Sequence, residues 1–130
     1  MAKKIFAKAF VNVVGTSFAN RQNSIWCLRT AESAFLTLKR EPNNKQDTNA
    51  IQVMAHTISK TGKRSHFCIG YIPADKATWM APAMDAGKLI RVGSYKVVGA
   101  GTTENYMGVK LVINHELYEL SDATAVAKDN

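Results

Sequence analysis

The sequence predicts a mainly β protein, built as a small six-stranded barrel with one or two short helices. Six short segments alternate between apolar and other residues with the two-residue period of a strand. Turn-forming residues separate these segments, and only one stretch has clear helical spacing. The chain has 130 residues, which is the length of one domain and is enough to bury a core. Several short strands in a chain of this size favour a barrel with a flanking helix.

The first strand is predicted over residues 5–14 and the first helix over residues 20–29. Both alternating sets of the strand are largely apolar, so we expect part of it to be buried on both faces. In the helix, Ile25 and Leu28 are spaced for one face, with Trp26 beside them. We expect Trp26, and Trp79 further along the chain, to pack against neighbouring residues.

A long hairpin is predicted next. Residues 35–40 and residues 51–56 both alternate, and the nine residues between them, EPNNKQDTN, are polar and rich in turn formers. Two such strands joined by a polar loop are typical of a hairpin. A second turn at residues 60–64 then leads to a fourth strand over residues 67–72.

The clearest helix is predicted over residues 73–87. Pro73 suits the first turn of a helix, because its φ is fixed and its missing N–H costs nothing there. Gly87 is the expected end of the helix. Apolar residues recur at i, i+3, i+4 and i+7 and define one buried stripe: Ala77, Met80, Ala81 and Met84. The two methionines are therefore interpreted as core residues.

Two more strands, at residues 89–98 and 107–113, surround a glycine-rich bend at residues 99–101. We therefore predict a single domain over residues 1–120. Residues 121–130 are small and polar, and we expect them to form a frayed C-terminal tail.

Charge is the first indication of function. The chain has 17 Lys and Arg residues and 10 Asp and Glu residues, for a net charge of +7. Residues 1–115 contain 16 of the basic and only 6 of the acidic residues, for a net charge of +10. A small domain this positive is suited to phosphate backbones or anionic lipid, although solubility alone explains the charge equally well. With 46% hydrophobic and 21% charged residues, the composition excludes wholesale disorder.

The sequence lacks the features of secreted and membrane proteins. Cys27 and Cys68 form no CxxC motif and no disulfide framework. Because Lys8 interrupts the first apolar run, we predict no signal peptide, and no stretch is apolar enough to span a membrane. We therefore expect a soluble cytoplasmic protein, or a nuclear one, that has no membrane contact.

The histidines and motifs do not indicate an enzyme. The three histidines are not spaced as metal ligands. No nucleophile elbow, zinc-protease motif or phosphate-binding loop is present in the sequence. We therefore expect no catalytic residue, no metal and no cofactor. A metal-dependent nuclease or lyase that uses Asp47 remains a third hypothesis.

The polar segment between the hairpin strands has two interpretations. Asn and Asp side chains commonly bond to their own backbone, so residues 41–49 are consistent with a loop that stabilises itself. The same donors and acceptors, fixed by a hairpin, are also consistent with a recognition loop. Composition alone favours the first interpretation.

Three segments, in the order VVGTSFANRQ (13–22), LKREPNNKQDTNAIQV (38–53) and IGYIPADKATWMAPAMDAG (69–87), resemble the HIRAN domain. The similarity extends over about residues 11–113. It implies an OB-like or SH3-like barrel that binds the 3′-hydroxyl end of single-stranded DNA. HIRAN domains are best known at the N-terminus of helicase-like transcription factor, which remodels stalled replication forks. This chain looks like a stand-alone bacterial or phage copy, so DNA repair and replication forks are its implied setting.

The resemblance also implies a binding site. Asp47 would accept a hydrogen bond from the terminal hydroxyl and repel a phosphate. Phe18 and Tyr71 would contact the terminal bases. Gln46 stands where the best-studied members have a tyrosine. The complete implied set is Phe18, Asn20, Arg21, Gln22, Arg40, Asn44, Lys45, Gln46, Asp47, Asn49, Ala50, Ile51 and Tyr71. Within it, Arg21, Arg40 and Lys45 would contact the phosphates, and Asn49, Ala50 and Ile51 would close the pocket.

Each implied role has a structural alternative. Asp47 is also suited to capping a turn by accepting backbone N–H bonds. Arg40 is positioned in the sequence to pair with Glu41 or to solvate a strand end. Phe18 is equally consistent with a core ring, and Tyr71 with an ordinary barrel residue.

The predicted function is a non-catalytic module that binds the 3′ end of single-stranded DNA, with a helicase or a nuclease as a further partner. The alternative is a protein-interaction barrel, an adaptor in a phage or DNA-repair complex, because exposed strand edges accept partner strands. The sequence leaves the oligomeric state open.

Overall fold

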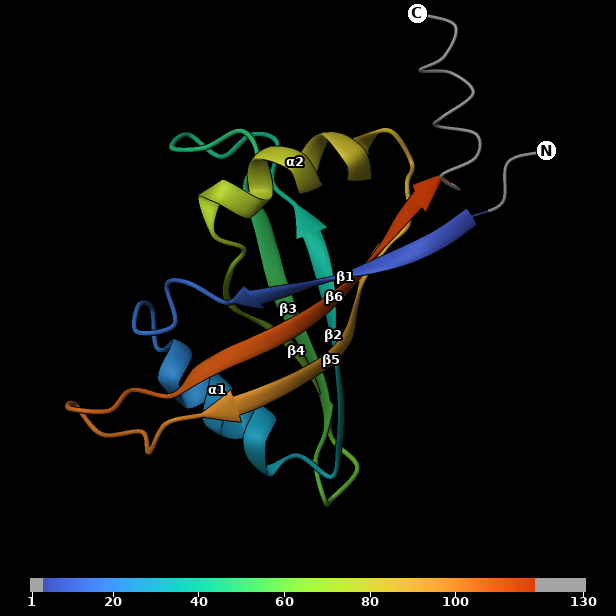
Figure 1. Ribbon diagram of the computed structural model, residues 1–130. Coiled ribbons are helices and arrows are strands. Elements are labelled where there is room, and N and C mark those ends of the chain that lie inside the picture. Colours follow the sequence, from blue (N-terminus) through green and yellow to red (C-terminus); the bar gives the residue numbers. More distant parts are fainter. Residues whose placement is uncertain (1–3, 119–130) are drawn as a thin grey trace, which may run out of the picture.

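The computed structural model describes residues 4–118 and contains six strands and two helices in that range (Figure 1). In chain order these are β1 (Lys4–Asn12), α1 (Arg21–Thr30), β2 (Ser33–Arg40), β3 (Ile51–Ile58), β4 (Arg64–Tyr71), α2 (Ala74–Asp85), β5 (Ile90–Val98) and β6 (Gly108–Tyr118). The predicted mainly β class, the six strands and the two helices are confirmed. The predicted tail at residues 121–130 lies outside the described residues.

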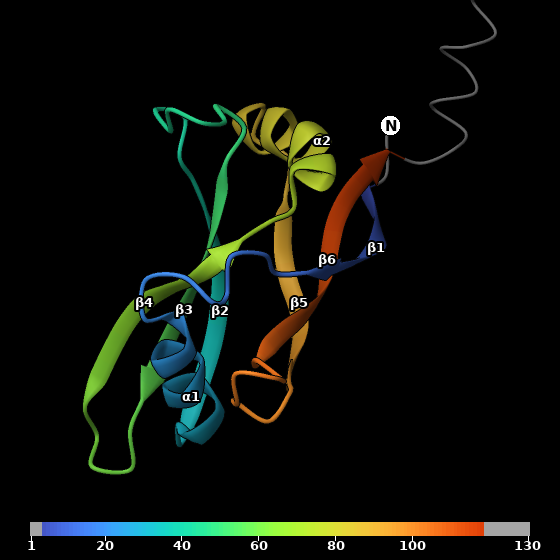
Figure 2. The ribbon, with the colours of Figure 1, turned by 90° about the vertical axis from the view of Figure 1, so that its left-hand side faces the viewer.

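The strands form two antiparallel three-stranded sheets, in the orders β1-β6-β5 and β2-β3-β4. Figure 1 shows the first sheet crossing in front of the second, and both views place α1 and α2 at opposite ends of the pair (Figures 1 and 2). Within residues 4–118, an isolated bridge between Val14 and Tyr71 is the one backbone pairing between the sheets. The fold is therefore an open sandwich, and the predicted closure into a barrel is not found.

The predicted hairpin is confirmed as β2 and β3, which pair from Arg40 opposite Ile51 to Ser33 opposite Ile58. Its alternation is visible in the burial of β3, where Ile51 and Val53 are fully buried and the intervening residues are half-buried. Burying one such side chain contributes roughly 1.5–3 kcal/mol. The register therefore fixes which residues of the connecting loop meet at its base.

The core lies between the two sheets and receives one side of each helix. Ile25 and Leu28 of α1 are buried, and so are Ala77, Met80 and Ala81 of α2, as predicted. The fourth residue of the α2 stripe, Met84, is half-buried against this core.

Two packing predictions are wrong. Strand β1 is not buried on both faces, because Phe6 and Phe10 are 47% and 75% exposed. No described element packs on the outer side of this strand (Figure 1). Trp26 is 54% exposed rather than packed. Trp79 is also partly exposed, and its ring lies 4.9 Å from that of His115.

A glycine permits the two sheets to meet. The backbone N–H of Val14 donates to the Tyr71 carbonyl, and the N–H of Tyr71 donates to the Val14 carbonyl, each at 2.9 Å. The preceding residue, Gly70, has φ +150°, and a Cβ there would lie 2.5 Å from the Val14 oxygen and from a methyl group of Val13. Only glycine fits this close approach. It brings the end of β4 beside the segment that follows β1 (Figure 2).

Candidate nucleic-acid interface

Loop 41–50 is held together by its own polar groups. The backbone N–H of Glu41 donates to the Ala50 carbonyl at 2.9 Å and closes the base of the loop. The Asn44 side-chain oxygen accepts the N–H groups of Gln46 and Asp47 at 2.9 and 3.0 Å. This is the self-bonded turn that composition favours, and it fixes the loop before any ligand arrives.

Asp47 takes the structural role that the sequence offered as its alternative, and the cap engages only one of its oxygens. One carboxylate oxygen, Oδ1, accepts the N–H of Asn49 at 2.8 Å and so caps the turn. Among residues 4–118, the second oxygen, Oδ2, has no hydrogen-bond partner. The turn therefore orients the carboxylate and leaves one acceptor available for a ligand.

Glu41 connects the loop to the end of β4. Its Oε1 accepts from the Asn44 side-chain amide at 2.9 Å and from the Tyr71 hydroxyl at 3.0 Å. Its Oε2 accepts from the side-chain amide of Gln52. The sequence marked Glu41 only as an ordinary loop carboxylate, because nothing in its local pattern shows that three donors from three segments converge on it.

The environment of Tyr71 raises the pKa of its phenol. A hydrogen bond from Gln52 lowers this pKa, but burial and the hydrogen bond and charge of Glu41 together outweigh that effect. Tyr71 therefore stays protonated and donates to Glu41.

Arg40 does not pair with Glu41, and its donors are engaged by other groups of the protein. Its guanidinium forms a bidentate ion pair with Asp85 at the end of α2, at 2.9 and 3.1 Å. It also donates to the carbonyls of Ala50 and Thr48 at 2.8 and 3.0 Å. The hydrogen bond with Asp85 raises the pKa of Arg40 and lowers that of Asp85. Arg40 therefore anchors loop 41–50 to α2.

Turn 15–20 forms the opposite side of the site. Arg21 Nη1 donates to the carbonyl of Gly15 at 2.7 Å, and the Arg21 backbone N–H donates to the Phe18 carbonyl at 2.9 Å. Ala19 and Asn20 have φ values of 53° and 62°, an uncommon conformation for residues other than glycine. The ring of Phe18 is 68% exposed, so Phe18 is not a core residue.

Asn20 and Gln22 have structural roles. The Asn20 carbonyl accepts the first N–H bond of α1, from Asn23, at 3.0 Å. The Gln22 side chain donates to the carbonyls of Thr16 and Met107 and accepts the N–H of Met107, all at 2.9 to 3.0 Å. Gln22 therefore fastens the turn to the start of β6 and has little capacity left for a ligand.

The turn, the loop and the end of β4 enclose an open pocket of about 620 Å³. Seven of the predicted binding residues line it: Phe18, Arg21, Asn44, Gln46, Asp47, Ala50 and Tyr71. Six do not line it: Asn20, Gln22, Arg40, Lys45, Asn49 and Ile51. Of these, Ile51 is fully buried in the core, and Lys45 is exposed. Four lining residues were missed by the sequence analysis: Val14, Gly15, Ile72 and Ala74. Their only signal was their place within the segments that carry the resemblance.

The pocket has cationic, acidic and aromatic groups at separate positions. The Arg21 guanidinium lies 5.2 Å from the centre of the Tyr71 ring, a distance suited to a cation–π contact. Phe18 and Tyr71 provide aromatic surface, and Asp47 provides the acceptor. Among residues 4–118, no group of three or more His, Cys, Asp and Glu residues is arranged to hold a metal ion.

Comparison with known proteins identifies the family. The sequence profile of the HIRAN domain matches residues 7–116, which is most of the chain. The chain belongs to the HIRAN domain family. HIRAN domains are DNA-binding modules, and the three segments that carry the resemblance all contribute to the pocket.

A solved structure has a similar fold. A crystal structure of a protein from Lactobacillus plantarum superposes with a TM-score of 0.55 at 22% sequence identity, covering 88% of this chain and 98% of that one. This likeness concerns the fold alone. No protein with a curated description matches the sequence. Among the described residues, neither helix of the HIRAN domain is long and apolar enough to cross a membrane.

Proposed function

We propose that this HIRAN domain holds the 3′-hydroxyl end of single-stranded DNA in the pocket between turn 15–20 and loop 41–50. The observation that carries the proposal is Asp47, because its carboxylate is oriented by one hydrogen bond and has one oxygen free at the pocket. Family membership supports DNA as the ligand class.

The chemistry of the carboxylate selects an end. A terminal 3′-hydroxyl donates a hydrogen bond to the free oxygen of Asp47, and a bond to a charged acceptor is stronger than a neutral one. An internal nucleotide or a 3′-phosphate presents an anion at the same place, and the like charges repel. Attraction and repulsion therefore both favour the hydroxyl.

The aromatic walls supply binding energy that does not depend on sequence. The exposed ring of Phe18 is available to stack on the terminal base, and such a stack contributes about 1–3 kcal/mol. Arg21 keeps donors free beyond its bond to Gly15 and lies beside the path of the terminal phosphates. Arg40 acts indirectly, by holding the loop that carries Asp47.

Fluorescence anisotropy with short oligonucleotides that end in a 3′-hydroxyl or in a 3′-phosphate tests the proposal. The native protein is expected to bind the hydroxyl end more tightly by about tenfold or more, as expected for a charge-assisted bond replaced by repulsion. Asp47→Asn keeps an oxygen for the Asn49 N–H and removes the charge, so it should bind both ends alike.

Asp75→Asn is the matched control, because Asp75 is an exposed carboxylate on α2 that does not line the pocket. This variant should keep the preference for the hydroxyl end. Equal affinity of the native protein for the two ends would remove the end-reading function. Loss of the preference in both variants would show that overall charge, and not the position of Asp47, decides it.

The cellular setting belongs to the same proposal. We propose a non-catalytic cytoplasmic module of a DNA-repair or replication-fork complex, in which a helicase or nuclease partner supplies the activity. Residues 1–120 would form its domain. Incubating labelled single strands with the protein and Mg²⁺ or Mn²⁺ should leave them intact, and cleavage that Asp47→Asn abolishes would support the nuclease hypothesis instead.

A further inference from the structure

The outer face of the sheet β1-β6-β5 is rich in cations and aromatic rings. Figure 1 shows this sheet in front, with no described helix or strand lying over it. Two adjoining shallow hollows, of about 380 and 310 Å³, follow this face along β1. Neither hollow shares a residue with the pocket described above.

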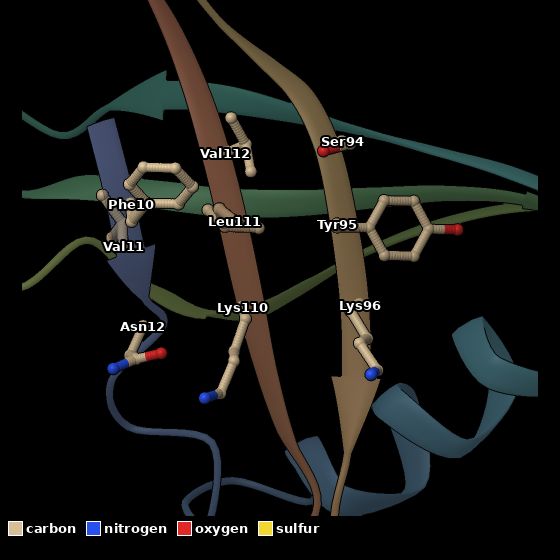
Figure 3. A pocket seen from close by; sticks show the side chains of 9 residues that line it. All are labelled: Phe10, Val11, Asn12, Ser94, Tyr95, Lys96, Lys110, Leu111 and Val112. Atoms are coloured by element: carbon tan, nitrogen blue, oxygen red, sulfur yellow. The ribbon is translucent and has the colours of Figure 1, made fainter. Parts of the chain in front are cut away.

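The strand register arranges these side chains in rows. Asn12, Lys110 and Lys96 lie opposite one another in the first row across β1, β6 and β5. The second row contains Phe10, Val112 and Ser94, and the third contains Lys8, Asn114 and Arg91. Figure 3 shows the first two rows, with Phe10 beside Val112 and with Lys110 and Lys96 side by side. An aromatic row is thus flanked by two rows that each contain two cations.

The groups in these rows are free to bind a ligand. Phe10 is 75% exposed, the most exposed large apolar side chain in the described part of the chain. Lys8, Arg91, Lys96 and Lys110 are exposed, and within residues 4–118 none of them is paired with a carboxylate. The carboxylate of the next row, Glu116, is buried and accepts the N–H of Leu89 at 2.7 Å.

We propose that this face is a second nucleic-acid contact, which binds a single strand away from its end. We call it the basic sheet face and define it as Phe6, Lys8, Phe10, Arg91, Lys96 and Lys110. Four cations with no exposed carboxylate among them are complementary to a polyanion. The exposed Phe10 ring between the cations, with the Phe6 ring beyond them, indicates a single strand rather than a duplex, because only unpaired bases offer their faces for stacking.

Strand β1 connects the basic sheet face to the pocket. Phe10 lies on the face and Val14, four residues further along the extended chain, lines the pocket. Four residues of a strand span about 13 Å. A DNA strand with its end in the pocket is therefore within reach of the face. This continuity rests on the proposed function, whereas the charge and exposure of the face do not.

Anisotropy titrations with oligonucleotides of about 4 and about 16 nucleotides, each with a 3′-hydroxyl and a 3′-phosphate version, test the inference. The native protein should bind the longer strand more tightly. Phe10→Ala should reduce that gain by about tenfold, the loss of one stacked base. The double variant Lys96→Ala/Lys110→Ala should reduce the slope of log affinity against log salt by about 1.4, the value for two phosphate contacts to a single strand.

Matched controls lie on the other sheet and its turn. Phe35→Ala removes a ring that is 60% exposed on the outer face of β2-β3-β4. Lys60→Ala/Lys63→Ala removes two exposed cations near the β3–β4 turn. Both controls should leave affinity and salt slope unchanged, and all variants should keep the native melting temperature and the preference for a 3′-hydroxyl.

The outcomes separate the two proposals. A preference for the hydroxyl end without any gain from length, or with a gain that Phe10→Ala leaves intact, would overturn the basic sheet face alone. A gain from length that Phe10→Ala removes, without any end preference, would support the face and overturn the pocket. If light scattering shows that Phe10→Ala splits an oligomer while DNA affinity is unchanged, the face binds a second copy and the inference is wrong.

Discussion

The two segments that flank the pocket are built in different ways. Loop 41–50 is held largely by side chains. Glu41 accepts hydrogen bonds from other segments, and Arg40 donates hydrogen bonds to other segments. Turn 15–20 is held mainly by backbone carbonyls and by the side chains of Arg21 and Gln22. The ring of Phe18 is left exposed at its tip.

This difference separates specificity from affinity. Under the proposed function, a carboxylate that distinguishes a hydroxyl from a phosphate has to be held in one orientation, and the hydrogen bonds around Asp47 provide this. A ring that stacks on any base needs exposed surface, and a close network around Phe18 would cover it. Changes to the loop network should therefore affect folding and end selection, whereas changes at the tip of the turn should affect affinity alone.

The largest expected effect comes from the point where the two sides meet. Gly70→Ala places a methyl group 2.5 Å from the Val14 oxygen, at a φ of +150°. We expect the unfolding free energy to fall by about 3 kcal/mol or more, because the Val14–Tyr71 bridge must open. Urea denaturation measures the loss.

Gly62→Ala is the control for this change, since Gly62 also has a positive φ, of +87°, but has no atom within 4 Å of its added Cβ. It should lose only about 1–2 kcal/mol, the strain of a left-handed alanine. Equal losses at the two glycines would mean that conformation alone, and not the close approach of β4, explains Gly70.

Removing the centre of the loop network should have the next largest effect. Glu41→Ala leaves the donors of Asn44, Gln52 and Tyr71 without their common acceptor. We expect a loss of about 3 kcal/mol in the unfolding free energy, together with loss of the preference for a 3′-hydroxyl. Glu104→Ala, at an exposed position between β5 and β6, should change neither property in the same denaturation and anisotropy assays.

At the tip of the turn the effect should be on binding only. Phe18→Ala should weaken binding of a short single strand by about tenfold, or about 1.4 kcal/mol, for either kind of end. The unfolding free energy should stay within about 0.5 kcal/mol of the native value, because the ring is exposed. A loss of several kcal/mol in the unfolding free energy would show that Phe18 packs in solution. The tip of the turn would then contribute to stability, as loop 41–50 does.

The smallest expected effect is on the pH dependence of stability. The hydrogen bond from Arg40 lowers the pKa of Asp85 below its ordinary value of 3.8. A carboxyl group with a lowered pKa adds stability above the ordinary value, and this contribution is lost as the pH falls through the lowered pKa. The melting temperature of Asp85→Asn should therefore lie slightly below that of the native protein at neutral pH and should converge with it in acid.

Glu104→Gln is the control, and its melting temperature should follow the native curve at every pH. A constant difference between Asp85→Asn and the native protein would contradict a pH-dependent contribution of the Arg40–Asp85 pair.

Much of the fold was predictable because its signals are local. Alternation over residues 35–40 and 51–56, and the spacing of Ala77, Met80 and Ala81, report which side of a single element is buried. Closure into a barrel and the burial of the first strand on both faces were predicted wrongly, because both depend on what lies across from an element. An apolar residue signals a preference for burial, but whether another element covers it is decided by topology.

The location of the candidate site was more predictable than the hydrogen-bond partners of its individual residues. Seven of the thirteen residues that the resemblance implies come together at one pocket, including Phe18, Asp47 and Tyr71. The partners of Arg40 and Gln22 were not predictable, since Asp85 and Met107 lie 45 and 85 residues away in the chain. The sequence shows that a guanidinium or an amide is present but not which distant group will engage it.

The Val14–Tyr71 bridge has one more consequence, for the order of events during folding. Within residues 4–118, no single hairpin contains the pocket, because its walls come from segments that pair only when the two sheets dock. Contacts between distant segments form late, after the entropy of closing a long loop has been overcome. A partly folded chain therefore lacks this pocket, and under the proposed function a bound oligonucleotide would select and protect the fully assembled domain.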